Sequence, residues 1–112
     1  MTESQQTRAF LKAWRDHYPL GLAVKLNDRS TVGLSDAVLM IAGATTWVEF
    51  KREGESLRPS QAAFHHKLRL AGICTAVVWF HPRREVTIQV GSLPPRRLSW
   101  RFVIACWAAI VA

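Results

Sequence analysis

The sequence predicts an α/β domain built around a mixed central sheet of about four strands. Three observations support this fold class: an amphipathic helical pattern over residues 2–17, two apolar runs joined by a small-residue turn over about 36–51, and a helical pattern over about 59–71 that leads into an apolar run at 74–80. A helix between two strands is typical of the crossover that joins parallel neighbours. The chain has 112 residues, which suits one domain covering residues 1–112.

The first helix can be capped by Thr2 or Ser4, because a hydroxyl accepts a hydrogen bond from the free backbone N–H groups of a first turn. Its apolar residues fall at helical spacing and form one stripe: Phe10, Leu11 and Trp14. Residues 22–26 then form a short strand candidate, and residues 27–30 read as a turn-rich loop.

The central hairpin consists of an apolar strand at 36–42, a tight turn at 43–45 and a β-branched and aromatic strand at 46–50. Side chains alternate along a strand, so Glu49 and Lys51 share one face. A charged pair on a strand in the middle of a sheet is costly unless the pair binds something. Such a conflict between pattern and charge is typical of a functional site.

The crossover helix begins at Pro59, which suits a first helical position, and Gly72 suits its C-terminal cap. Gln61 and His65 lie on the helix face that we expect to meet the sheet. The apolar strand at 74–80 follows, and its continuous apolar character predicts burial on both faces.

The C-terminal region is harder to assign. Residues 85–90 alternate like an exposed or edge strand, and residues 93–97 interrupt the pattern with two prolines and two arginines. Residues 100–112 fit a short helix or a strand pair, and we prefer the helix. We therefore treat residues 81–112 as a basic and apolar extension whose role the sequence does not define.

Charge favours a polyanionic partner, since the formal net charge is +7 and the isoelectric point is about 10.5. Residues 1–56 hold seven Lys/Arg and seven Asp/Glu, whereas residues 57–112 hold eight Lys/Arg and one acid. The acids thus accompany the central hairpin and the excess positive charge lies downstream. The simpler alternative is that the basic half is only a solvated surface.

The two cysteines and the composition of the terminal segments indicate the cellular compartment. Cys74 and Cys106 lie in apolar runs without metal-ligand spacing, which predicts buried free thiols in a reducing, cytoplasmic compartment. The polar N-terminus does not resemble a secretory signal, and the uncharged run at 102–112 is too short to span a bilayer. We therefore expect no membrane partner and no small-molecule cofactor, and read that run as a buried helix or a face shared with a second copy.

The central hairpin carries the residue types needed to cleave a phosphodiester. Asp36 and Glu49, on adjacent strands, offer hard oxygen ligands that suit Mg²⁺, with Mn²⁺ as a possible substitute, and the backbone carbonyl of Phe50 offers a third. Lys51 could orient the attacking water and offset phosphate charge. Gln61 could hydrogen-bond that lysine, the water or the substrate.

Each of these residues also has a simpler explanation. Asp36 could cap a turn, Glu49 and Lys51 could form a surface ion pair, and Gln61 could be an ordinary polar residue of a first turn. Glu3 would extend the acidic cluster only if the first helix packs beside it. The histidine pair at 65–66 lacks a cysteine or acid at metal spacing, which argues against zinc.

Four segments carry a resemblance to a known family: GLSD (33–36), VEFK (48–51), PSQAAFHHKLRLAG (59–72) and TAVVW (75–79). In this order and at this spacing the chain resembles the PD-(D/E)XK nuclease superfamily. More narrowly, it resembles the short stand-alone members of the VRR-NUC (virus-type replication-repair nuclease) family. The resemblance covers a core of about residues 1–80.

The resemblance implies a restriction-endonuclease-like core and a metal-dependent DNA endonuclease, with Asp36, Glu49 and Lys51 as its catalytic set. Gln61 matches the family's helix glutamine, and Glu3 matches the acid of its first helix. The family also implies branched, flap or junction DNA as substrate, in replication, recombination or repair, and a homodimer.

Two departures from the family pattern stand out: Ser35 replaces a proline that is not a ligand, and Arg58 replaces a helix-capping Ser or Thr. Five basic residues are predicted to contact DNA: Lys25, Arg52, Arg58, Lys67 and Arg69. The main alternative is a non-catalytic nucleic-acid-binding domain of the same fold. A second alternative is a membrane-associated or assembly protein that acts through residues 98–112.

Overall fold

The computed structural model describes residues 1–26 and 30–112. Within these ranges six strands form one sheet, in the order β1-β2-β3-β4-β5-β6. The strands are β1 (Leu22–Lys25), β2 (Ala37–Ile41), β3 (Ala44–Arg52), β4 (Cys74–His81), β5 (Glu85–Val90) and β6 (Arg96–Ser99). The β3–β4 pair is parallel and every other neighbouring pair is antiparallel. The predicted parallel crossover is therefore confirmed.

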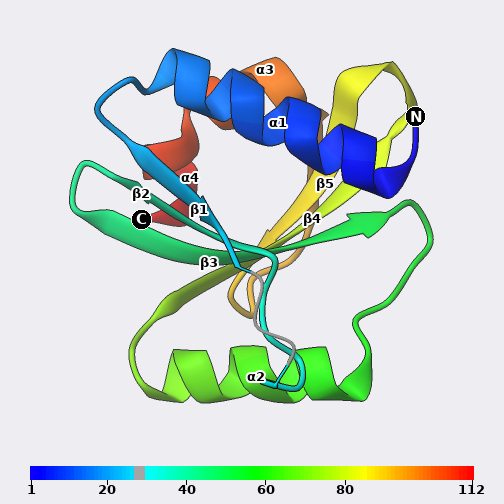
Figure 1. Ribbon diagram of the computed structural model, residues 1–112, viewed down its shortest axis with the longest axis vertical. Helices are drawn as coiled ribbons and strands as arrows, with labels where there is room; N and C mark the ends of the chain where they lie inside the picture. Colours follow the sequence, from blue (N-terminus) through cyan, green and yellow to red (C-terminus); the bar gives the residue numbers. More distant parts are fainter. Residues whose placement is uncertain (27–29) are drawn as a thin grey trace.

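Helices cover both faces of this sheet, as Figure 1 shows. They are α1 (Glu3–His17), α2 (Pro59–Leu70), α3 (Trp100–Ala105) and α4 (Trp107–Val111), with a short 3₁₀ turn, η1 (Pro82–Arg84), before β5. α1, α3 and α4 lie on one face, and α2, the crossover between β3 and β4, lies alone on the other. The predicted helix at 100–112 is confirmed, with a break at Cys106.

The main core lies between the sheet and the layer that contains α1. Its centre is Phe10, whose ring meets those of Phe50 and Trp100 at centroid distances of 5.6 and 5.5 Å. Phe80 stacks on Phe50 at 5.6 Å, and the rings of Trp107 and Phe10 meet edge to face at 6.4 Å. Such aromatic packing fastens α1 to β3, so α1 holds a fixed position relative to the charged residues of that strand.

Local sequence explains the ends of these elements. Thr2 caps α1, with its hydroxyl accepting from the N–H of Gln5 while the Gln5 side chain accepts from the N–H of Thr2. The β2–β3 turn is Ala42-Gly43, where both residues have positive φ, as the tightest hairpins require. The predicted turn at 43–45 was therefore wrong by one residue, because Ala44 already pairs with Ile41.

The sheet has six strands where the sequence predicted about four. The missed strand is β6, whose four residues follow two prolines and include Arg96 and Arg97, so it has neither the length nor the apolar pattern of a strand. Its pairing with β5 places β5 inside the sheet, and the prediction of an edge strand at 85–90 was wrong. Residues 27–29 of the predicted loop at 27–30 lie outside the described part of the chain.

Two further expectations concern the thiols and the membrane. Cys74 and Cys106 are free, but both are half-buried where the sequence predicted full burial. Among the described residues, no helix combines the length and the apolar character needed to cross a bilayer.

Candidate active site

Asp36 is held at the point where β2 begins. Its backbone N–H donates to the carbonyl of Val48 at 3.0 Å, which extends the β2–β3 pairing by one residue beyond Ala37. Its carboxylate Oδ2 accepts from the backbone N–H of Phe50 at 2.7 Å. The hairpin register therefore fixes this side chain against β3, directly beside Glu49.

Glu49 is buried, with 3% of its surface exposed. Its Oε1 accepts from Nε2 of Gln61 on α2 at 3.0 Å, and the Gln61 Oε1 in turn accepts from the N–H of Arg58 at 2.9 Å. Oε2 of Glu49 has no hydrogen-bond partner among the described residues. An orphaned carboxylate oxygen in a buried position is the kind of atom that a bound cation satisfies.

Electrostatics agree with that geometry. The pKa of Glu49 is raised to about 8, first by burial and then by the neighbouring Asp36 carboxylate, and Lys51 only partly offsets these effects. Two carboxylates with too little positive charge nearby favour either a proton or a metal ion between them. At neutral pH, when no cation is bound, the acidic pair therefore retains a proton on Glu49, which a bound cation would displace.

Lys51 follows Glu49 on the same face of β3 and is also buried, with 7% of its surface exposed. Phe50 lies between them with its ring in the core on the opposite face. Because the N–H and C=O of one strand residue point to the same side, and the Phe50 N–H reaches Asp36, the Phe50 carbonyl also faces the Asp36 side of β3. The four predicted groups of the hairpin are thus brought together.

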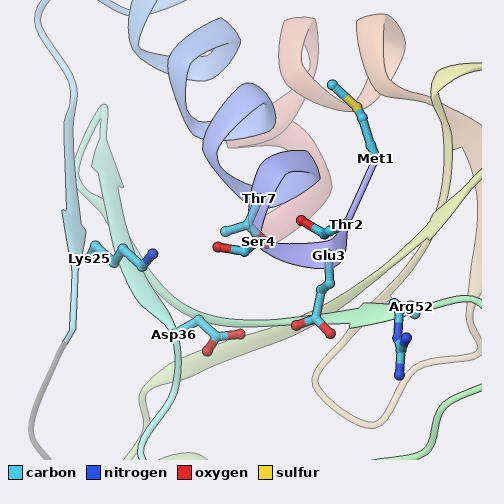
Figure 2. A pocket seen from close by; sticks show the side chains of 8 residues that line it. All are labelled: Met1, Thr2, Glu3, Ser4, Thr7, Lys25, Asp36 and Arg52. Atoms are coloured by element: carbon cyan, nitrogen blue, oxygen red, sulfur yellow. The ribbon is translucent and has the colours of Figure 1, made fainter.

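A hollow of about 660 Å³ opens beside this cluster, between the start of α1 and the ends of β1, β2 and β3. Figure 2 shows Glu3 directed into it from the first turn of α1, toward the region that Asp36 faces. The pKa of Glu3 is raised, first by burial and then by the charges of Glu55 and Asp36. Lys25 and Arg52 line the same hollow, so two of the five predicted DNA contacts lie at its rim.

The other three predicted contacts lie elsewhere. Arg58 is exposed at the start of α2, where only its backbone N–H takes part in the network through Gln61. Its guanidinium cannot accept a hydrogen bond, so it does not replace the missing Ser or Thr cap. Lys67 and Arg69 lie in the last turn of α2, and Arg69 donates to the hydroxyl of Thr75 at 3.3 Å. They are not part of the hollow.

The sequence did not predict two contacts that hold the segment before β2 against α2. Ser35 Oγ and His65 Nε2 are 2.8 Å apart, and both side chains are buried. Burial lowers the pKa of His65 to about 4, with a further contribution from Arg69, so the ring is neutral at physiological pH. Gly33 packs against α2 so closely that a Cβ there would lie 2.1 Å from the carbonyl oxygen of Ser60. The helical face of His65 and the GLSD segment were visible in the sequence, but nothing in it paired them.

These donors suit a hard divalent cation. Mg²⁺ keeps several waters and needs few protein oxygens, which the Asp36 and Glu49 carboxylates and the Phe50 carbonyl can provide. Within the described ranges there is no group of three or more His, Cys, Asp or Glu side chains placed to hold a metal. That finding argues against a site made of side chains alone and is compatible with a site completed by a backbone carbonyl and water.

The fold and the site together define an α/β protein with an N-terminal helix, a mixed sheet, and an acidic pair and a buried lysine on its central hairpin. This arrangement is consistent with a restriction-endonuclease-like fold. No family model and no curated protein matches the sequence. The chain is similar in structure to Hjc, a Holliday junction resolvase from the archaeal hyperthermophile Archaeoglobus fulgidus, solved at 1.6 Å resolution. The match has a TM-score of 0.61 at 15% sequence identity and covers 90% of this chain and 98% of that one. At this identity the likeness shows the fold.

Proposed function

We propose that this protein is a metal-dependent DNA endonuclease that selects branched DNA, such as junctions or flaps. One observation carries the proposal: Asp36 and Glu49 lie side by side on the central hairpin, and a buried Glu49 oxygen lacks a partner among the described residues. Lys51 is buried on the same strand face, where its ammonium group can meet a phosphate or a water. The fold shared with a Holliday junction resolvase favours a branched substrate.

Each side chain has a separate role in this proposal. Asp36, Glu49 and the Phe50 carbonyl would hold Mg²⁺, with Mn²⁺ as a substitute and Glu3 as an added acid at the rim. The metal would supply positive charge to the phosphate and lower the pKa of a bound water. Lys51 would orient the attacking water.

Gln61 fixes the orientation of Glu49, because its amide donates to one carboxylate oxygen and leaves the other free. Its own carbonyl is held by the N–H of Arg58, so the amide cannot flip without breaking that hydrogen bond. Gln61 therefore acts as a positioning residue in this proposal. The narrower assignment to the VRR-NUC family and the homodimer that it implies stay predictions.

The second candidate is a nucleic-acid-binding domain without catalysis. The net charge of +7, most of it downstream of the site, favours this function independently of the acidic pair. A buried acidic pair beside a lysine has no purpose in simple phosphate binding, since the acids repel the backbone. We therefore rank the non-catalytic binding domain second.

The test is cleavage of a four-way junction, a flap and a linear duplex with Mg²⁺, Mn²⁺ or EDTA. We expect the branched substrates to be cut with either metal, and cutting to be lost in EDTA and in the Asp36→Ala and Lys51→Ala variants. Glu53→Ala serves as the matched control, because this exposed acid pairs with His81 outside the site. If the two site variants cut as well as the parent chain, the catalytic assignment is wrong.

A further inference from the structure

A second hollow lies at the other end of α1, on the layer opposite α2. It has a volume of about 690 Å³ and lies between the end of α1, the η1 turn and the start of α3. Its polar and charged lining residues are His17, Arg83, Arg84, Ser99 and Arg101. None of the described residues that line it is acidic, so the hollow concentrates positive charge.

The η1 turn holds its arginines in an unfavourable backbone conformation. Arg83 and Arg84 both have left-handed backbones, with φ of 63° and 53°. Residues other than glycine, asparagine and aspartate seldom adopt this region, and two in succession are rarer still. Strain of this kind is typically kept where a side chain serves a function. Here it directs two neighbouring arginines to the rim of one hollow.

The arginine side chains are available to a ligand. The Arg84 guanidinium stacks on the ring of Trp100 at 5.0 Å, which orders it while leaving its N–H donors uncommitted to a carboxylate. Among the described residues, no ion pair involves Arg83, Arg84 or Arg101, although nearby Arg97 pairs with Glu85. All three are exposed. A set of exposed guanidinium groups without carboxylate partners, one of them ordered by an aromatic ring, is suited to bind phosphate oxygens.

We propose that the hollow formed by Arg83, Arg84 and Arg101 binds the phosphate backbone of a DNA segment that lies away from the cut site. This inference rests on the proposed function, and it adds a contact that the predicted set of DNA-binding residues does not contain. Glu3 and His17, which mark the two hollows, are separated by the length of α1, about 21 Å at 1.5 Å per residue. That length corresponds to about six base pairs of duplex.

The inference is tested by DNA binding in EDTA, where cleavage plays no part. The test variant is Arg83→Asn with Arg84→Asn, because asparagine tolerates the left-handed backbone and removes both charges. The control is Arg96→Gln with Arg97→Gln, which loses the same charge from exposed positions of β6. Affinity for a four-way junction and for a linear duplex is measured by fluorescence anisotropy over a range of salt concentrations.

We expect the test variant to bind the junction roughly tenfold more weakly and to reduce the slope of log K against log salt by about 1.8, or 0.9 for each lost contact. The control should keep the slope of the parent chain. An unchanged slope in a test variant that unfolds at the temperature of the parent chain would overturn the proposal. If the double variant does not fold, Arg101→Gln alone replaces it, with an expected slope loss of about 0.9. An unchanged slope in that variant likewise overturns the proposal.

The two proposals can fail separately. If the chain never cuts DNA but the test variant still lowers the salt slope, the nuclease proposal fails and the phosphate site stands. If the parent and the test variant cut and bind branched DNA equally well, the phosphate site fails and the nuclease proposal stands.

Discussion

Replacing Glu49 by glutamine tests whether the acidic pair is destabilising without a cation. The pKa of Glu49 is about 8 in the folded chain against an ordinary value of 4.5, because the carboxyl is buried and faces Asp36. Between these values the folded protein holds about one proton more than the unfolded chain. Stability therefore falls with rising pH by up to about 1.4 kcal/mol per pH unit from this group, and the loss is complete above the folded pKa.

The loss of stability at neutral pH follows from that slope. From pH 4.5 to pH 7 the loss due to Glu49 reaches roughly 3 kcal/mol as an upper bound. Glutamine has the same shape, carries no charge and can still accept the hydrogen bond from Gln61. We expect Glu49→Gln to be about 2 kcal/mol more stable than the parent chain at pH 7 in EDTA, and about equally stable at pH 4.5.

The measurement is urea unfolding at a series of pH values, with EDTA present throughout. Glu55→Gln is the control, because the pKa of Glu55 is lowered by its hydrogen bonds with Arg52, so its removal brings no gain as pH rises. A stability difference between Glu49→Gln and the parent chain that stays constant from pH 4.5 to pH 8 would refute the reasoning. We also expect Mg²⁺ to raise the unfolding temperature of the parent chain and to leave that of Glu49→Gln unchanged.

Three further substitutions probe the surroundings of the site and the hairpin. Gly33→Ala places a Cβ against the α2 backbone at positive φ, and urea unfolding should show a loss of about 2–4 kcal/mol. The pKa of His65 is lowered to about 4, so the stability that its neutral ring contributes is fully present above pH 6.5 and is lost as pH falls toward 4. His65→Gln should therefore make the loss of stability between pH 6.5 and pH 4 less steep. Ala42→Asn converts the turn to Asn-Gly and should add roughly 0.5–1 kcal/mol to stability.

Each of these three has a contrary result. A Gly33→Ala chain as stable as the parent would mean that the GLSD segment does not pack tightly on α2. Acid unfolding that is the same in His65→Gln as in the parent chain would mean that His65 does not titrate as its burial requires. A destabilising asparagine at position 42 would mean that the turn is not of the tight type with two left-handed residues.

The parts of the site that lie within one hairpin were predictable from sequence. Glu49 and Lys51 share a face because strand side chains alternate, and Asp36 meets them because the turn is short enough to fix the register. The direction of Gln61 was predictable because it shares one face of the helix with Phe64, His65 and Leu68, and Gln61 and His65 are buried on that face. These are local rules, and local rules hold where the chain returns on itself within a few residues.

The parts that failed depend on contacts between distant segments. The Ser35–His65 hydrogen bond joins residues 30 apart, and neither residue type signals the other. β6 exists because an adjacent strand offers unpaired backbone groups, although Arg96 and Arg97 give it no strand pattern of their own. The second hollow brings His17 beside Arg101 across most of the chain, so the positive charge counted in the sequence could not be assigned to a place.

The location of Glu49 and Lys51 on β3 has a consequence for how the site opens. β3 is paired on both edges, and α1 and α4 both pack against it. Its backbone amides should therefore exchange with deuterium only when most of the sheet opens. The acidic pair and the lysine are therefore expected to keep their relative positions through every local opening of the molecule. Adjustment to a bulky substrate would then come from the surrounding segments, while the reactive groups stay as a rigid unit.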